Sequence, residues 1–465
     1  MTQSNPKGVP ENRKSELPMY QQIISEDVHA APAIFREYSE IDIDVPGVPR
    51  ARYTDKAFFD MEVARMWSRV WQLACREEQI PEVGDCLVYE SPGASLFLVR
   101  SSATHIKGFY NTCRHRGMRL CAADTSMAQI RCPYHGFTWN LDGSLKSIPA
   151  AWDFPQIKNN DVPLLEVRVE CWGGFVFINR DPDAAPLRSY LANLPAHFAD
   201  WPRDAVYLAI NIRKVIHANW KACIEGFIES FHVAELHSQA MPFSGDSSTQ
   251  YDVWPGNENI SRFLEPSGIP SEHYSVRLDE QAIYAAMLRT VTGSAEAPLL
   301  PAGVRARTAM ADLSRSAMSQ LDQRDYSRLS DTEALDPAQY SIFPNIVIFR
   351  SLGYPYLYRF LPARDDPHST VFDFMIFRPK PVDGAAIPEV RRIELGPQDT
   401  FTDCGAFPPW LGQIYDQDTQ GLRNLQEGLR AGAAEDIMLS RYQEVRIRHL
   451  QQTLMRYISR PPGSP

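Results

Sequence analysis

The chain has 465 residues, with 47 Lys and Arg against 57 Asp and Glu, a formal net charge of −10 and a pI near 5.6. This length favours two domains, and the acidic balance argues against nucleic acid as a partner, because nucleic-acid-binding surfaces are usually basic. The sequence contains no apolar run near the ~20 residues of a membrane helix and no apolar signal core. Eight cysteines in so long a chain do not indicate a disulfide framework, so we expect a cytoplasmic protein that uses clustered cysteines for metal binding.

The first region in chain order predicts a small β domain with a leading helix. Residues 1–44 are polar and contain prolines, which predicts a mobile tail. Residues 50–72 have helical apolar spacing. Residues 74–180 contain short apolar runs such as CLVYE and GFVFIN, broken by Gly, Pro and Asp, and these predict antiparallel strands. We therefore place a domain at residues 45–182.

The second region, residues 183–465, predicts a larger domain of mixed content. A strand-like run is followed by a helix-like stretch, broken helices, returning strands and a helical end, at residues 205–216, 220–237, 275–335, 341–379 and 416–458. The predicted fold class is α+β, with an N-terminal antiparallel β domain and a C-terminal domain in which helices flank an antiparallel sheet.

Two Cys/His pairs in the β domain form a candidate iron–sulfur site. Cys113 and His115 make one pair, Cys132 and His135 make the other, and sixteen residues stand between His115 and Cys132. In a cluster of two irons and two sulfides, two thiolates hold one iron and two imidazoles hold the other, which raises the reduction potential. Each iron would draw one ligand from each loop, so the two loops would clamp the cluster together.

Residues beside these pairs suit close turns, although other interpretations exist. Gly117 and Gly136 stand where the backbone must turn, and Pro133 stiffens the second loop. The four residues could instead lie in unrelated turns or hold a structural zinc. Zinc fingers usually pair Cys with Cys and His with His in sequence, whereas each pair here is mixed.

The sequence around these pairs resembles a known family. RHRG after Cys113 and PYHGFTWNLDG, which contains His135, are similar to the Rieske domain of ring-hydroxylating oxygenases. Respiratory Rieske proteins carry two further cysteines that form a disulfide, and Tyr134 stands where that family has one of them. Cys121 is then expected to be a buried free thiol, which favours the oxygenase branch.

The segment NWKACIEGFIESFHVAELH, residues 219–237, supplies a second candidate metal site. His232 and His237 are five residues apart, and Glu229 precedes His232 by three. Two histidines and one carboxylate on one face leave open positions on an Fe(II) that activates O₂. On an ideal helix five residues turn by about 500°, so a π-bulge or a helix end must bring the two rings together. Alone, such a motif is more often an ordinary helix.

The resemblance implies roles for these residues. Glu229 would be a bridging carboxylate that links His232 to a cluster histidine, His135, of a neighbouring subunit, because in the family the two metals of one chain lie too far apart. A ring-shaped homo-oligomer, a trimer, is then expected. The third iron ligand would be Asp418, from YDQDTQGLRNLQEGL, which resembles the family's closing helix. Asp416 is the alternative, and a solvated acidic helix start would explain either residue without a metal.

The expected function follows from these motifs and from what is missing. The sequence has no G-x-G-x-x-G after a strand and no plant-type run of cysteines, so electrons must come from a reductase, with or without a ferredoxin. We expect an enzyme that uses O₂ to hydroxylate an aromatic or other apolar small molecule. A glutamate at the bridging position resembles the branch acting on quaternary amines, whose pocket would need an aromatic cage. A Rieske electron carrier would need only the first domain. Candidate cage residues are Trp139, Trp254, Phe343, Tyr354, Tyr356 and Trp410.

Overall fold

The chain folds into two compact units. The computed structural model describes residues 17–39, 42–44, 47–158, 161–201, 203–293, 296–381 and 384–460. One unit, here the β unit, consists mainly of Phe59–Tyr190. The other, here the larger unit, consists of the chain up to Phe58, Leu191–Trp201 and Ala205–Arg456. The segment 47–58, which we had expected to lead into the β domain, belongs to the larger unit.

The N-terminal segment differs from the mobile tail that we predicted. Residues 17–39 contain two short helices, α1 (Tyr20–Ile24) and α2 (Ala33–Arg36). Tyr20 and Phe35 are fully buried and pack with Leu264 and Ala338 of the larger unit. A few apolar side chains in a polar segment are therefore enough to hold it, once tertiary partners are available. Residues 1–16 and 40–41 of the predicted tail lie outside the described residues.

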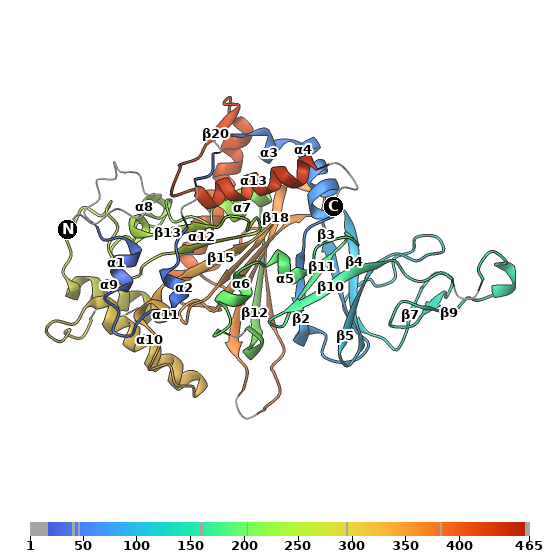
Figure 1. Cartoon of the computed structure of the whole chain (residues 1–465), viewed down its shortest axis with the longest axis horizontal. Helices are drawn as coiled ribbons and strands as arrows, with labels where there is room; N and C mark the ends of the chain where they lie inside the picture. Colours follow the sequence, from blue (N-terminus) through green and yellow to red (C-terminus); the bar gives the residue numbers. More distant parts are fainter. Residues whose placement is uncertain are drawn as a thin grey trace. The chain divides into compact units, whose positions relative to one another are not determined.

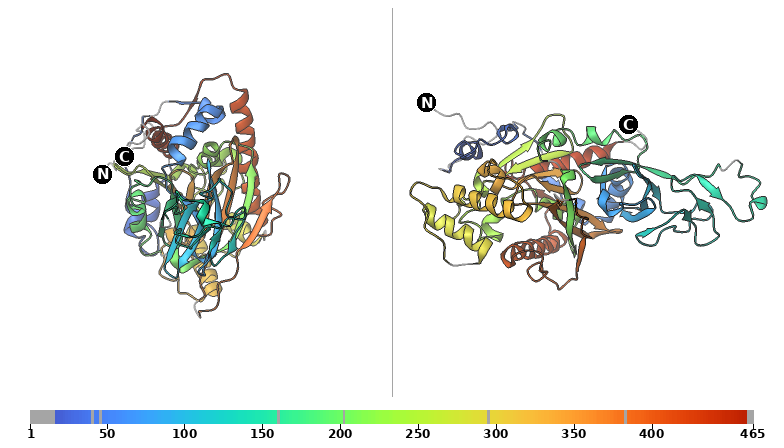
Figure 2. Two further views of the ribbon diagram at one scale, coloured as in Figure 1. Left: turned by 90° about the vertical axis from the view of Figure 1, so that its right-hand side faces the viewer. Right: turned by 90° about the horizontal axis from the view of Figure 1, so that it is seen from below.

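The β unit contains a seven-stranded antiparallel sheet, ordered β2-β11-β10-β5-β4-β3-β6, and a three-stranded sheet, β7-β8-β9. The smaller sheet lies at one end of the unit in Figures 1 and 2. The larger sheet comprises β2 (Gln72–Arg76), β3 (Asp85–Ser91), β4 (Ala94–Ser102), β5 (His105–Tyr110), β6 (Thr125–Ser126), β10 (Glu166–Trp172) and β11 (Phe175–Asn179). The smaller sheet comprises β7 (Ile130–Arg131), β8 (Thr138–Trp139) and β9 (Leu145–Ser147).

The larger unit is built on an eight-stranded sheet, ordered β13-β14-β15-β16-β17-β18-β12-β19. All neighbours are antiparallel except β12 and β19. Its central strands are buried along almost their whole length, as in β16, whose sequence IVIF has no exposed residue. Its strands are β12 (Val206–Ile216), β13 (Gln250–Val253), β14 (Ile260–Leu264), β15 (Ala338–Ile342), β16 (Ile346–Phe349), β17 (Tyr356–Ala363), β18 (Asp366–Pro379) and β19 (Arg391–Leu395). A two-stranded sheet pairs β1 (Gly47–Pro49) with β20 (Asp436–Met438).

Helices complete both units. The predicted single helix at residues 50–72 is instead α3 (Ala51–Thr54), α4 (Lys56–Met61) and the π-helix η1 (Glu62–Trp67). The longest helix, α12 (Pro409–Ala431), carries the predicted ligand Asp418. The other α-helices are α5 (Leu187–Tyr190), α6 (Leu194–His197), α7 (Trp220–Glu225), α8 (Val233–Leu236), α9 (Glu280–Thr292), α10 (Ala306–Asp322), α11 (Asp331–Leu335) and α13 (Val445–Ser459). Short 3-10 turns are η2 (Glu77–Gln79), η3 (Ala151–Asp153), η4 (Arg203–Ala205) and η5 (Asp246–Ser248).

These elements confirm the predicted α+β class, with antiparallel sheets in both units and most of the helix in the larger one. In the described part of the chain, none of the helices combines the length and apolarity that crossing a bilayer requires.

Candidate metal centres

The two Cys/His loops of the β unit have the same backbone geometry. The Cys113 N–H donates to the Met118 carbonyl over 2.7 Å, and the Cys132 N–H donates to the Phe137 carbonyl over 2.8 Å. Each cysteine is thus closed into a turn by a carbonyl five residues later. Both cysteines are buried, whereas the loop tips are exposed. Equivalent turns place the two Cys/His pairs in equivalent positions.

A glycine makes each turn possible. The Gly117 and Gly136 N–H groups donate to the carbonyls of Cys113 and Cys132 over 3.0 and 3.1 Å. Their φ angles are +77° and +73°, in the left-handed region where a side chain is strained. A Cβ on Gly136 would also stand 3.2 Å from Pro149 Cγ, whereas one on Gly117 would have room. The two glycines singled out from the sequence therefore serve the same backbone need.

The structure brings all four predicted cluster ligands together. The rings of His115 and His135 lie with centroids 4.8 Å apart. Burial raises the pKa of the Cys113 thiol, and a hydrogen bond with Cys132 adds to that shift. The Nδ1 atom of His115 is buried and has no hydrogen-bond partner. A buried imidazole nitrogen without a partner is costly unless it binds a ligand, so this atom suits metal coordination.

The four predicted cluster ligands are grouped by type. The thiols of Cys113 and Cys132 interact through a hydrogen bond, and the rings of His115 and His135 lie together. This grouping fits a cluster in which two thiolates hold one iron and two imidazoles hold the other.

The segment after the first loop is held by Asn111. Its amide donates to the Cys121 carbonyl over 2.7 Å and accepts from the N–H groups of Leu120 and Cys121. Cys121 is a buried free thiol, as predicted. Its Sγ lies 3.7 Å from Sγ of Cys86, a neighbour that the sequence did not indicate.

In the larger unit the two candidate histidines flank a short helix that ends between them. The predicted helix over residues 220–237 is wrong as one element: α7 ends at Glu225, and α8 is a single turn over Val233–Leu236. His232 immediately precedes α8 and His237 immediately follows it. Their ring centroids are 5.2 Å apart. Of the two predicted ways to bring the rings together, a π-bulge or a helix end, the structure has the helix end.

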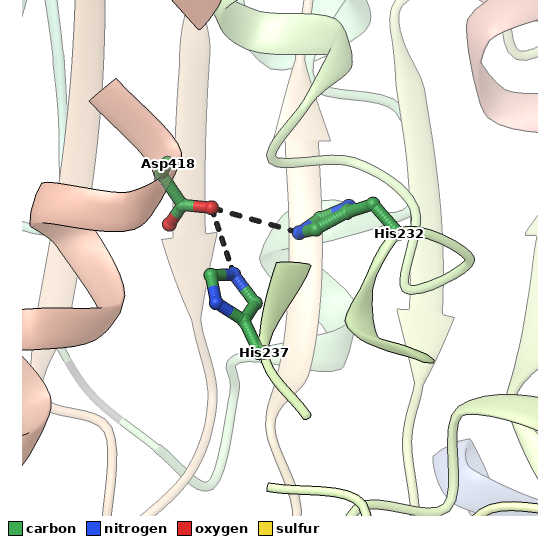
Figure 3. A group of neighbouring side chains, drawn as sticks. All are labelled: His232, His237 and Asp418. Carbon is green, nitrogen blue, oxygen red and sulfur yellow. Dashed lines mark hydrogen bonds and ion pairs between the residues drawn. The ribbon is translucent and has the colours of Figure 1, made fainter. Parts of the chain in front are cut away.

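Asp418, on the distant helix α12, completes the set. Its Oδ1 lies 2.8 Å from Nε2 of His237 and 3.6 Å from Nε2 of His232, so both rings point at one carboxylate oxygen (Figure 3). The ligand atoms of these three residues lie within 4.8 Å of one another. The carboxylate of Asp416 instead accepts hydrogen bonds from the backbone N–H groups of Phe401 and Thr402. The structure thus places Asp418, not Asp416, beside the histidines.

Two further side chains orient the imidazoles. Glu229 Oε1 lies 2.6 Å from Nδ1 of His232, and Gln417 Oε1 lies 2.9 Å from Nδ1 of His237. These acceptors fix the proton of each ring on Nδ1 and leave each Nε2 lone pair directed at the shared point. Gln417 was missed from the sequence because it stands next to Asp418 and has no motif of its own. Its role is visible only once α12 is placed beside α8.

Two carboxyl groups, Glu229 and Asp418, act on His232 in the absence of a metal. Burial alone would lower the pKa of His232, but Glu229 and Asp418 outweigh it and raise that pKa to about 9. A bound cation would replace the proton. The three side chains, with two neutral imidazole nitrogens and one carboxylate, fit the ligand set of a mononuclear Fe(II) with open positions.

Aromatic side chains and one further carboxyl surround this ligand set. Tyr358 and Tyr415 share a hydrogen bond of 2.6 Å, and the charge of Asp418 acts on both. Tyr356 is half-buried, and burial raises its pKa to about 12. Glu265 interacts with His232, and burial raises the pKa of its carboxyl to about 7. Glu265 carried no signal in the sequence, because it follows strand β14 outside any motif.

Comparison with known proteins is consistent with this geometry. Residues 194–460 match the family described as the ring hydroxylating alpha subunit, catalytic domain, and residues 70–158 match the Rieske [2Fe-2S] domain. The first match covers more than half of the chain. The chain belongs to the ring-hydroxylating alpha subunit family. This confirms the family recognised from the sequence. It also confirms the two cofactors, a Rieske [2Fe–2S] cluster and a mononuclear iron.

The relatives of this ring-hydroxylating alpha subunit include both a dioxygenase subunit and a monooxygenase subunit. The chain is 36% identical over 188 residues to biphenyl 2,3-dioxygenase subunit alpha of Rhodococcus jostii (strain RHA1), a match covering 39% of this chain and 41% of that protein. It is 29% identical over 193 residues to the carnitine monooxygenase oxygenase subunit of Escherichia coli (strain K12), covering 41% and 52%. The matches thus span about half the length of these relatives. A solved quaternary ammonium Rieske monooxygenase shares the fold, with a TM-score of 0.64, 16% identity and coverage of 90% and 96%.

Proposed function

We propose that this chain is the terminal component of a Rieske oxygenase, which uses O₂ and externally supplied electrons to hydroxylate an aromatic or other apolar small molecule. The observation that carries the proposal is the convergence of His232, His237 and Asp418 in a chain that also holds a Cys₂His₂ set suited to a cluster. An electron carrier would not need the first of these ligand sets. The aromatic side chains around Asp418 favour an apolar substrate.

The roles of the residues follow from their contacts. When bound, the cluster supplies electrons and the iron activates O₂. Cys113, His115, Cys132 and His135 would hold the cluster, and His232, His237 and Asp418 the iron. Glu229 orients His232 and keeps its Nε2 free for the metal. Gln417 does the same for His237.

We also propose that Glu229 is one half of a bridge between subunits. Its bond to His232 is present within the chain, and His135 is exposed, so a carboxylate of another copy can reach it. A hydrogen-bonded carboxylate would couple the two imidazoles over a short path. This requires a homo-oligomer, which we propose to be a ring-shaped trimer, and a reductase, with or without a ferredoxin, as electron donor. We propose a cytoplasmic location, because eight cysteines in a chain of 465 residues are too few for a disulfide framework.

The first experiment measures product formation. The iron-reconstituted protein would be reduced chemically and exposed to isotopically labelled O₂ with a panel of arenes, and products would be analysed by mass spectrometry. We expect labelled oxygen in a hydroxylated or dihydroxylated arene. Reduction of the cluster without any labelled product from the panel would contradict an oxygenase acting on such compounds.

The Glu229→Gln variant tests the bridge. Both metals should be retained, because no cluster or iron ligand is changed, but turnover should fall at least about tenfold, since the amide carries no charge and orients His232 less well. Glu235→Gln is a matched control, because Glu235 is exposed in the neighbouring helix α8. Normal turnover in Glu229→Gln would refute the bridging role.

A second candidate substrate class is a methylated or quaternary amine. The observation favouring it is Glu265, a carboxyl near His232 that also interacts with the partly accessible Tyr354. A carboxylate beside tyrosine rings suits a cation, since both attract positive charge. Glutamate at position 229 favours the same branch through the family resemblance.

The two classes can be separated with one variant. Paired reactions with an arene and with a trimethylated amine would be compared between the wild type and Glu265→Gln. If the substrate is a cation, the amine reaction, recognised by aldehyde release, should lose affinity for its substrate in the variant. If the substrate is apolar, arene turnover should be retained or improved, because the neutral amide removes a charge from the surroundings of His232.

A further inference from the structure

Cys86 and Cys121 form a thiol pair that the proposed oxygenase mechanism does not use. Their Sγ atoms lie 3.7 Å apart, and both residues are almost completely buried. Cys86 is on β3, in register with Val99 of β4 and Thr125 of β6. Neither residue belongs to the four predicted cluster ligands. The pair nevertheless lies in the same hydrophobic core as Cys113 and Cys132.

The backbone holds Cys121 firmly against β3. Its N–H donates to Asn111 Oδ1 over 2.8 Å, and its carbonyl accepts from Asn111 Nδ2 and from Arg119 Nε. Three residues later, Asp124 accepts from the Val88 N–H of β3 over 3.0 Å. These bonds hold the Cys121 backbone in place, and a disulfide would require the two sulfur atoms to close from 3.7 Å to about 2.05 Å.

The two sulfur atoms have different electrostatic surroundings. The hydrogen bond from Cys86 lowers the pKa of the Cys121 thiol; burial opposes this, and the charge of Arg119 lowers that pKa further. Donating that hydrogen bond raises the pKa of Cys86, as do burial and the charge of Asp124. Cys121 is therefore the better nucleophile, whereas Cys86 more readily keeps its proton. This asymmetry suits Cys121 as the attacking thiol and Cys86 as the resolving thiol.

We propose that Cys86 and Cys121 are a dithiol modification site that hydrogen peroxide converts reversibly to a disulfide. The Cys121 thiolate attacks one peroxide oxygen, the O–O bond breaks, and the released hydroxide takes a proton and leaves as water. Cys121 then carries a sulfenic acid. The Cys86 sulfur attacks Cys121, the S–O bond breaks, and the hydroxyl leaves with the Cys86 proton as a second water. Two thiols lose two electrons, and peroxide gains them.

The disulfide would tie the first cluster loop to the sheet. Cys121 ends the segment that begins with the ligands Cys113 and His115. Asn111 accepts from the N–H groups of Leu120 and Cys121 and donates to the Cys121 carbonyl. A covalent bond from Cys121 to β3 would restrain this segment at its far end. Restraint of the loop would be measurable as a change in the cluster's reduction midpoint between the dithiol and disulfide forms.

The test uses the full-length, iron-loaded protein and hydrogen peroxide as the oxidant. After treatment, free thiols would be alkylated, and peptides analysed by mass spectrometry with and without dithiothreitol. We expect loss of alkylation at Cys86 and Cys121 together, a linked peptide pair, recovery with dithiothreitol and retention of the cluster's visible spectrum. This outcome does not depend on oxygenase activity.

Three variants sharpen the result. Cys86→Ser should abolish the linked peptide and leave a sulfenic acid on Cys121, trapped with dimedone. Cys121→Ser should abolish both signals. Cys171→Ser, which changes an exposed cysteine of β10, should leave the linked peptide unchanged. The proposal is overturned if both thiols of the wild type remain fully alkylated after peroxide, or if Cys113 and Cys132 are linked instead and the cluster spectrum is lost.

Discussion

The two ligand sets of this chain are built in different ways. In the β unit, four ligands come from two short loops, and each loop is closed by its own backbone hydrogen bonds and its own glycine. In the larger unit, two histidine ligands flank one helical turn, and the third ligand, Asp418, comes from a helix about 180 residues later. Side-chain contacts with Glu229 and Gln417 hold the two imidazoles in place. The first set is a product of local geometry and the second is a product of tertiary packing.

This difference implies different sensitivities. A substitution in a cluster loop of the β unit should act through backbone strain, and its effect should be confined to the cluster. A substitution near the ligand set of the larger unit should act through orientation, since His232 depends on an acceptor three residues away and His237 depends on an acceptor from the distant helix α12. The following predictions test whether the two sets fail in these separate ways.

The largest effect is expected for Asp418→Ala. It removes one of three iron ligands and leaves His232 without a carboxylate opposite it, so the mononuclear iron should be lost and product formation should become undetectable. The cluster's visible spectrum should persist, because the β unit is unchanged. Iron content and spectrum would be measured on the same sample.

Asp416→Ala is its matched control on the same helix. Asp416 holds the backbone of Phe401 and Thr402, so its removal should cost about 1–3 kcal/mol of stability and leave iron content intact. Iron loss in Asp416→Ala with retention in Asp418→Ala would reverse our choice of ligand.

A smaller effect is expected for Gln417→Ala. Without its acceptor, the Nδ1–H of His237 no longer fixes the ring, and affinity for Fe(II) should fall about 10–100-fold while the cluster is retained. Gln413→Ala, at an exposed position of α12, should leave iron affinity unchanged. An unchanged affinity in Gln417→Ala would mean that packing alone orients His237.

The pH dependence of iron binding should follow His232. Its pKa in the metal-free fold is raised to about 9, so a proton must leave before iron binds, and affinity should fall up to about tenfold for each pH unit below 9. The protonated ring also stabilises the metal-free fold. That contribution is complete below the ordinary pKa of 6.5 and is lost as pH rises through 9. Calorimetric iron titrations between these pH values would check the trend, and a flat profile would contradict it.

The smallest effect is expected for the loop glycines. Gly136→Ala and Gly117→Ala should each cost about 1–2 kcal/mol through the left-handed backbone. Gly136→Ala should cost more, because its Cβ would press on Pro149. The stability of both variants would be measured as the temperature at which the visible colour of the cluster is lost. The affinity of the larger unit for iron should not change. Equal losses in both variants would show that the contact with Pro149 relaxes freely.

The sequence by itself determined the cluster loops, the family and the residues of the histidine pair. Each of these features depends on neighbours along the chain, such as the mixed Cys/His pairs and the glycine four residues after each cysteine. The separation of five positions from His232 to His237 also predicted a π-bulge or a helix end between them. The sequence did not locate that end, because the end of α8 at Leu236 depends on how this segment packs.

Only the tertiary structure decided the rest. Asp418 and Asp416 are indistinguishable by composition, and the rotation of α12 directs one to the histidines and the other to residues 401–402. Gln417, Glu265 and the Cys86–Cys121 pair became visible for the same reason, because each meets its partner across the fold. The N-terminal helices were missed because Tyr20 and Phe35 are few among polar residues, and their burial depends on partners more than 200 residues away. Local chemistry can be read from neighbours in sequence, whereas long-range contacts depend on packing that no single segment encodes.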